Sequence, residues 1–167
     1  NRLWELNLPY ETLEQFGAKL GADVPFLVQG GTAFAEGIGE KLKPVTVEFP
    51  KAVLVATPHC AVPTKDAYAG VKPSGNVRWE QFRSAWNGTL SFEFYNKFEE
   101  SVFPKYPMIQ DLKNKLENLG AFKTLMSGSG ASVFALFDSE ENAKKALAII
   151  EPTVRFSRIT QFKEKLI

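Results

Sequence analysis

Two apolar runs joined by a short Ser- and Gly-rich segment constrain the fold of this chain more than any other feature. Residues 121–126 read AFKTLM, residues 131–137 read ASVFALF, and Ser-Gly-Ser-Gly lies between them. Both runs are rich in residues that favour strands, and a short connection containing glycine is typical of a β-hairpin. We therefore expect an antiparallel pair of strands in the C-terminal part of the chain.

The segments before the hairpin predict a strand followed by helices. KAVLVATP, which starts at residue 51, has the pattern of a buried strand. MIQDLKNKLENLG predicts an amphipathic helix with Gly120 as its C-cap. Shorter helices are expected in TKDAYAGV, VRWEQFRSAW and LSFEFYNKFEESVF.

The segments after the hairpin complete a recognisable order. SEENAKKALAII predicts a helix with Ser139 as its N-cap, and RFSRITQF predicts a last strand. The order from residue 51 is then the split β-α-β-β-α-β pattern. The expected fold class is α+β: a ferredoxin-like plait, with an antiparallel sheet and additional helices over one face.

Residues 1–50 do not fit inside this order, so we expect two domains, 1–50 and 51–167. PYETLEQFGAKL predicts a helix, and TAFAEGIGEKLKPV is strand-like with a tight bend at Gly37 and Gly39. NRLWELNL already has helical spacing at the first residue. The chain is therefore expected to be a fragment that begins inside an element.

Composition excludes several classes of protein. Hydrophobic residues make up 44% of the 167 residues, which allows a real core, and the net charge is only +1 without a basic block, so nucleic acid is not an expected partner. The single cysteine, Cys60, rules out an internal disulfide framework and fits a cytoplasmic protein. No apolar run is long enough to cross a bilayer.

The segment between the hairpin strands is the first candidate site. Gly128 and Gly130 permit positive φ angles and can turn successive N–H groups toward one point, which suits phosphate oxygens. Ser127, Ser129 and Ser132 are hydroxyl donors in or beside the same segment. Taken alone, the segment is explained more simply as a plain hairpin turn with permissive glycines, and this alternative stays open.

Asp23, in LGADVPF, is the second candidate. Its carboxylate is suited to accepting or orienting a hydroxyl proton during phosphoryl transfer. The alternative is an N-cap, because a short helix with Pro25 in its first turn is expected directly after it. The two roles are compatible.

Thr64 and Tyr68, in PHCAVPTKDAY, are the third candidate. They share one face of the expected helix, where a hydroxyl and a ring could fix and stack a planar polar ligand. The alternative is a Thr cap with Tyr68 half-buried against the sheet. The adjacent His59 and Cys60 have no partners at metal-ligand spacing, so no metal site is expected.

These segments together resemble one family. LGADVPF, GGTAFAEGIGEKLKPV, PHCAVPTKDAY, NKFEESVFPKYP and MSGSGASVFALF occur in this order over essentially the whole chain. This arrangement is similar to the 4-diphosphocytidyl-2-C-methyl-D-erythritol kinase family of the GHMP kinase superfamily, which serves the non-mevalonate route to isoprenoid precursors. Homoserine and mevalonate kinases of the same superfamily resemble the chain less well.

The resemblance implies an ATP-dependent kinase that phosphorylates the 2-hydroxyl of a cytidyl-diphosphate-linked sugar alcohol, with Mg²⁺ accompanying ATP. Asp23 matches the catalytic aspartate of the family. Ser127 to Gly130 matches its C-terminal glycine motif, which closes over the phosphates. Thr64 matches a substrate-contacting threonine, and Tyr68 falls where the family has an aromatic residue that stacks on cytosine, a contact worth about 1–3 kcal/mol in nucleic-acid complexes.

The chain also departs from the family pattern. The family's catalytic lysine and its Gly/Ser-rich triphosphate loop do not lie in these residues, so the resemblance implies the C-terminal part of the kinase and no kinase activity for the chain alone. Residues 1–50 would lack the sheet that they normally cover, so we expect them to be mobile or paired with a second copy. The rival hypotheses are another GHMP kinase, acting on homoserine or a mevalonate, and a non-catalytic α/β-plait interaction module.

Overall fold

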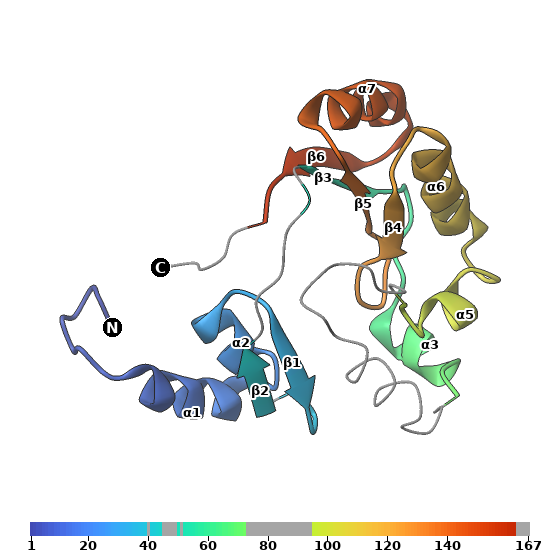
Figure 1. Ribbon diagram of the computed structural model, residues 1–167. Helices are drawn as coiled ribbons and strands as arrows, with labels where there is room; N and C mark the ends of the chain where they lie inside the picture. Colours follow the sequence, from blue (N-terminus) through green and yellow to red (C-terminus); the bar gives the residue numbers. More distant parts are fainter. Residues whose placement is uncertain (40, 45–49, 51, 73–94, 163–167) are drawn as a thin grey trace. The chain divides into compact units, whose positions relative to one another are not determined.

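The computed structural model describes residues 1–39, 41–44, 50, 52–72 and 95–162. The chain divides into two compact units between residues 48 and 49. We call the described residues up to 44 the smaller unit and those from 50 onward the larger unit. Figure 1 shows the elements of both units.

The smaller unit consists of two helices and a two-stranded sheet. Helix α1 spans Tyr10–Leu20 and helix α2 spans Val24–Gln29. Strands β1, Ala33–Glu36, and β2, Lys41–Pro44, pair antiparallel. The chain bends between them as expected, with φ angles of 72° at Gly37 and 117° at Gly39.

The first eight residues are not helical, so the helical spacing of NRLWELNL was misleading. Asn1 makes two bonds to Leu8: its Oδ1 accepts from Leu8 N at 2.9 Å and its Nδ2 donates to Leu8 O at 3.1 Å. These bonds compete with helical ones, and the following Pro9 also disfavours the α conformation at Leu8. Glu5 and Asn7 accordingly have φ angles of 51°.

The larger unit contains one antiparallel sheet with the strand order β4-β5-β3-β6. The strands are β3, Ala52–Thr57, β4, Lys123–Met126, β5, Val133–Phe137, and β6, Phe156–Thr160. Helices α3 (Thr64–Ala69), α5 (Glu99–Val102) and α6 (Pro107–Asn118) lie between β3 and β4 in the sequence. Helix α7, Glu140–Ile150, and a 3₁₀ turn, Glu151–Thr153, precede β6. The predicted α+β class is confirmed.

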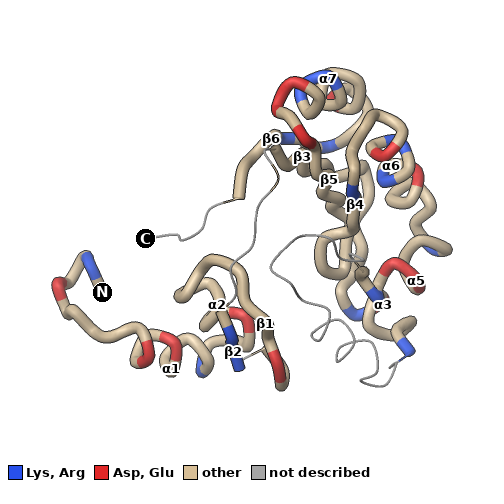
Figure 2. Tube along the Cα trace, viewed as in Figure 1, with Lys and Arg blue, Asp and Glu red and all other residues tan. Residues whose placement is uncertain are grey.

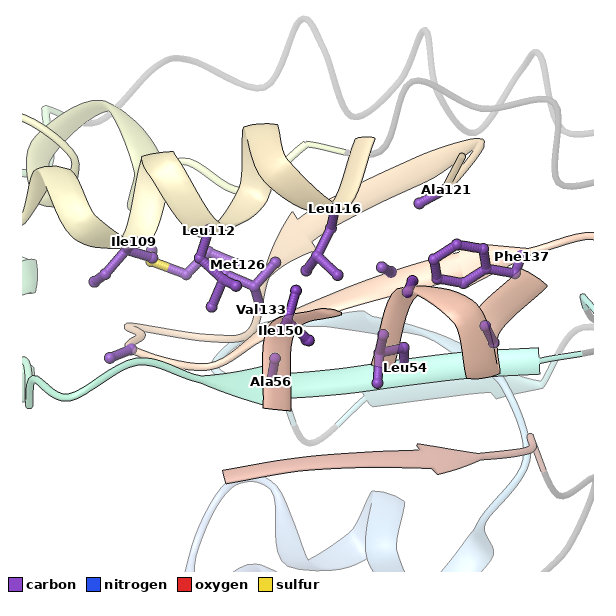
Figure 3. Close-up of a cluster of buried hydrophobic side chains, with 14 of the residues drawn as sticks. Leu54, Ala56, Ile109, Leu112, Leu116, Ala121, Met126, Val133, Phe137 and Ile150 are labelled. Carbon is purple, nitrogen blue, oxygen red and sulfur yellow. The ribbon is translucent and has the colours of Figure 1, made fainter. Parts of the chain in front are cut away.

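The core lies between one face of this sheet and helices α6 and α7. Alternate residues of the two central strands point into it: Ala52, Leu54, Ala56, Val133, Ala135 and Phe137. From the helices come Ile109, Leu112, Leu116, Ala143, Ala146 and Ile150. Figure 3 shows Ile109, Leu112 and Leu116 in line along α6, facing the sheet. This is the period-of-two and helical-stripe pattern that buries one face of each element.

Local signals account for the ends of α6 and α7. Gly120, at φ 93°, follows α6, and its N–H donates to Glu117 O at 2.9 Å while Ala121 N donates to Leu116 O at 3.2 Å. This is a Schellman motif, as the glycine predicted. Ser139 Oγ accepts from Asn142 N at 3.2 Å and caps α7. The helix predicted in residues 77–86 lies outside the described residues. Of the helix predicted in residues 90–103, the described part is helical only at α5, Glu99–Val102.

Candidate active site

The loop between β4 and β5 is closed by its own backbone. Ser127 N donates to Ser132 O at 2.8 Å, and Gly130 N donates to Ser127 O at 3.0 Å. Gly128 and Gly130 have φ angles of 54° and 94°. Within the described part of the chain, no acceptor is found for the N–H groups of Gly128 and Ser129. The hairpin is therefore real, and it leaves two successive N–H groups for an anion.

Helix α3 lies beside this loop. Thr64 is its first residue, and Thr64 Oγ1 lies 3.5 Å from Ser129 Oγ, at the long limit for a hydrogen bond. The N-cap position is taken by Pro63, and Thr64 makes no capping bond, so the alternative of a Thr cap does not hold. The hydroxyl groups of Thr64 and Ser129 therefore lie next to each other, although they belong to different elements.

Tyr68 lies one turn further along α3 and is 64% exposed, not half-buried against the sheet. Its ring meets that of Phe98 edge to face, with centroids 4.8 Å apart and planes at 73°. Ser101 Oγ donates to Ala67 O at 3.2 Å, which ties α5 to α3. The Tyr68 ring is therefore supported by α5 while most of it remains accessible to a ligand.

The Ser132 hydroxyl, which the sequence indicated as a possible donor to a phosphate, already has a partner within the fold. Its hydroxyl lies 2.8 Å from Thr57 Oγ1, at the end of β3, and the Thr57 side chain is buried. A buried hydroxyl needs such a partner. Ser132 therefore fastens the start of β5 to β3, and the remaining loop hydroxyls are those of Ser127, which is exposed, and Ser129, which is partly exposed.

Asp23 belongs to the smaller unit. It occupies the N-cap position of α2, as expected, but its side chain makes no capping bond. The Asp23 side chain is exposed, and no described residue donates a hydrogen bond to its carboxylate or forms an ion pair with it. Gly39 faces it: a Cβ built there would lie 3.5 Å from Asp23 Oδ1. Among the described residues, nothing therefore ties the Asp23 carboxylate to the fold.

Two further residues at the loop, Asn96 and Glu99, were missed by sequence reasoning. Asn96 Nδ2 donates to the carbonyl oxygens of Met126 and Gly128, both at 2.7 Å, and Glu99 Oε1 accepts from Met126 N at 2.8 Å. They lie in NKFEESVFPKYP, one of the segments that carries the family resemblance. No spacing rule could have linked them to a loop some 30 residues away.

The described residues contain no group of three or more His, Cys, Asp or Glu side chains that could hold a metal ion. Burial raises the pKa of the Cys60 thiol, and the positive charge of Arg155 opposes this only in part. A raised pKa keeps the thiol protonated at neutral pH, so Cys60 is not an activated nucleophile. The loop and α3 of the larger unit offer hydroxyls and backbone N–H groups, and the Asp23 carboxylate lies on the smaller unit.

Comparison with known proteins identifies the class. Residues 80–152 match the family model described as GHMP kinases C terminal. A homoserine kinase from Cytophaga hutchinsonii, with 21% sequence identity, has the same fold, with a TM-score of 0.74 over 98% of this chain and 61% of that one. Residues 80–152 are therefore similar to the C-terminal domain of GHMP kinases, and the chain shares the fold of one member of that class.

Two further comparisons point to one particular kinase within this class. The chain is 34% identical over 163 residues to the 4-diphosphocytidyl-2-C-methyl-D-erythritol kinase of Thermodesulfovibrio yellowstonii, which covers 90% of this chain and 57% of that protein. A crystal structure of a 4-(cytidine 5'-diphospho)-2C-methyl-D-erythritol kinase aligns with a TM-score of 0.76 at 27% identity, over 98% of this chain and 60% of the other. The chain is thus a homologue of these kinases and spans somewhat more than half of their length.

No helix in the described part of the chain is long and apolar enough to cross a membrane.

Figure 2 shows Lys and Arg interspersed with Asp and Glu on α6 and α7. On α7 these charges form the pairs Glu140–Lys144, at 2.8 Å, and Glu141–Lys145, at 2.7 Å.

Proposed function

We propose that this chain is the substrate-side part of an ATP-dependent kinase that phosphorylates the 2-hydroxyl of 4-diphosphocytidyl-2-C-methyl-D-erythritol. The observation that carries the proposal is the arrangement on the larger unit. Exposed Tyr68 and Thr64 lie on one short helix, and Thr64 Oγ1 lies 3.5 Å from Ser129 Oγ, in a loop where two N–H groups have no acceptor among the described residues. A nucleobase and a phosphate group of one ligand require such neighbours.

Each residue has a defined part in this proposal. Tyr68 stacks on the cytosine ring, and Thr64 hydrogen-bonds the substrate. Gly128 and Ser129 donate their N–H groups to phosphate oxygens, with Ser127 and Ser129 supplying hydroxyls and Gly130 shaping the bend. Asp23 orients the attacking hydroxyl and accepts its proton late, because an ordinary carboxylate is too weak a base to ionise an alcohol beforehand.

ATP supplies the phosphoryl group in this scheme. The described residues offer no carboxylate cluster for a divalent cation. We therefore infer that Mg²⁺ is held by phosphate oxygens and water, as is common for this ion. In the same scheme residues 1–50 are the end of the N-terminal kinase domain, and residues 51–167 form the C-terminal domain.

Two alternatives make different predictions about ligands. Homoserine and mevalonate contain no nucleobase, so with either substrate the exposed Tyr68 ring would have no base to stack on. A non-catalytic interaction module would show no dependence on nucleotide. Both alternatives therefore fail if the chain prefers cytidine nucleotides.

The test is a titration of the purified chain with cytidine diphosphate, and with adenosine diphosphate and uridine diphosphate for comparison. Heteronuclear NMR of the ¹⁵N-labelled chain gives both the affinity and the residues that respond. We expect the strongest binding for the cytidine compound and at least about fivefold weaker binding after Tyr68→Ala, since a stacking contact is worth about 1–3 kcal/mol.

Tyr10→Ala is the matched control, because Tyr10 is another exposed tyrosine, on α1. Its removal should leave cytidine diphosphate binding unchanged. Equal affinities for the three diphosphates, or equal losses in the two variants, would contradict the proposed substrate.

A further inference from the structure

We infer that Asn96 and Glu99 form a positioning device, here called the Asn96–Glu99 clamp, which holds the Ser127–Gly130 loop in its ligand-receiving shape. The inference rests on the proposed function in that it concerns the same loop. It adds two residues that contact neither the substrate nor the reacting atoms in the proposed scheme. They act through the backbone of Met126 and Gly128.

Among the described strands, none pairs with the outer side of β4, and the clamp supplies hydrogen-bond partners there instead. Strand β4 is at the edge of the sheet, and Ser127 N points inward to Ser132 O. Because successive residues of a strand point their N–H and C=O groups to opposite sides, those of Met126 point outward. Glu99 Oε1 accepts the Met126 N–H at 2.8 Å, and Asn96 Nδ2 donates to Met126 O at 2.7 Å. Both outward groups of Met126 are thereby satisfied by side chains.

The same amide reaches into the loop itself. Asn96 Nδ2 has two hydrogens, and its second acceptor is Gly128 O, also at 2.7 Å. Fixing this carbonyl fixes the peptide plane that carries the next N–H group, that of Ser129. Asn96 Oδ1 in turn accepts from Phe98 N at 3.0 Å, which sets the orientation of the amide. Asn96 therefore controls one of the two N–H groups that are free to meet a phosphate.

Lys113 neutralises the charge of the Glu99 carboxylate, which lies next to the loop that we propose to bind phosphate. Its Nζ lies 2.6 Å from Glu99 Oε2, and the two side chains are only 19% and 15% exposed. An unpaired carboxylate at that depth would repel a phosphate bound to the loop, and burying it alone would be costly. With Lys113 paired, Glu99 can hold the Met126 N–H without adding a net negative charge near the loop.

The first experiment needs no ligand. Amide hydrogen exchange of the purified chain is compared for wild type, Asn96→Ala and Asn114→Ala, where Asn114 is an exposed residue of α6. Asn96→Ala should speed exchange of the hydrogen-bonded Ser127 and Gly130 amides about tenfold, because two hydrogen bonds to the loop region are lost, while the amides of β3 keep their rates. Unchanged exchange at Ser127 and Gly130 in a folded Asn96→Ala chain would overturn the clamp.

The second experiment tests positioning with inorganic pyrophosphate and cytidine as separate probes. Asn96→Ala should weaken pyrophosphate binding at least fivefold and leave cytidine binding, which depends on Tyr68, unchanged. Glu99→Gln retains an acceptor for Met126 N and should keep more pyrophosphate affinity than Glu99→Ala. Faster loop exchange without a loss of pyrophosphate affinity, or equal losses for both probes, would overturn the positioning role.

The proposed function fails in a different way. If the wild-type chain binds neither cytidine nor pyrophosphate, the kinase scheme loses its ligand site, and the positioning role is overturned with it. The exchange experiment still decides whether Asn96 holds the loop, because it does not depend on either probe.

Discussion

Gly128 and Gly130 lie in the same loop, but they require glycine for different reasons. At φ 54°, Gly128 is in the left-handed region that other residues can enter at a cost, and a Cβ there would meet nothing within 4 Å. At φ 94°, Gly130 is further from that region, and a Cβ would lie 2.9 Å from Met126 Sδ in the core. The first glycine serves the turn, and the second also permits close packing.

Alanine substitutions should separate these two reasons. We expect Gly128→Ala to lower the free energy of unfolding by about 1 kcal/mol, from backbone strain alone. Gly130→Ala should cost about 3 kcal/mol, because strain and the contact with Met126 add together. Urea unfolding followed by circular dichroism measures both. Equal losses would show that the Met126 contact is relieved without cost.

At the scale of single elements, the cap of α7 gives a second prediction. Ser139 Oγ accepts from Asn142 N at 3.2 Å, so Ser139→Ala removes the partner of one N–H group at the helix start. The free energy of unfolding should fall by about 1 kcal/mol in chemical denaturation. Ser139→Thr keeps the hydroxyl and should recover most of the loss. Failure of Thr to do better than Ala would assign the effect to something other than the cap.

The elements that could be predicted are those with local signals. Gly120 and Ser139 marked two helix ends correctly, the apolar runs of β4 and β5 predicted the hairpin, and the apolar run of β3 predicted the buried strand. The prediction of helical structure in residues 1–8 was wrong. The Asn1–Leu8 hydrogen bonds depend on contact between two residues seven positions apart, which helical spacing does not reveal.

Sequence reasoning predicted individual residues of the candidate site, but it did not predict which of them contact one another. Sequence indicated Thr64, Tyr68 and the glycine loop separately, whereas the 3.5 Å approach of Thr64 to Ser129 joins residues that are 65 positions apart. The Asn96–Glu99 clamp was missed for the same reason. The use of Ser132 was misjudged because its partner, Thr57, lies on another strand. The roles of Asp23, Thr64 and Tyr68 stay predictions until ligands are tested.

At the scale of the whole molecule, the division into two units predicts how damage spreads. Leu54 is fully buried in β3, and Leu54→Ala should destabilise the larger unit by about 3 kcal/mol. Amide exchange should then accelerate in β3, β5 and α6, while the rates in α1 and β1 stay the same, because each unit has its own contacts. Parallel acceleration in both units would show that they unfold together.

Several large apolar side chains of the smaller unit are exposed, among them Leu3 at 85% and Trp4 at 74%. Such residues favour association when they are left uncovered. Pairing of the smaller unit with a second copy of the chain therefore stays a prediction, which sedimentation at several protein concentrations can decide.

The Asn96–Glu99 clamp has a consequence beyond the candidate site. An edge strand that shows free N–H and C=O groups is a template on which strands of other molecules can assemble into aggregates. At Met126, the end of β4 nearest the loop, side chains already occupy both outward groups. A strand from another chain would have to displace two hydrogen-bonded side chains before it could pair there. The residues that hold the loop therefore also protect this end of the sheet against intermolecular strand addition.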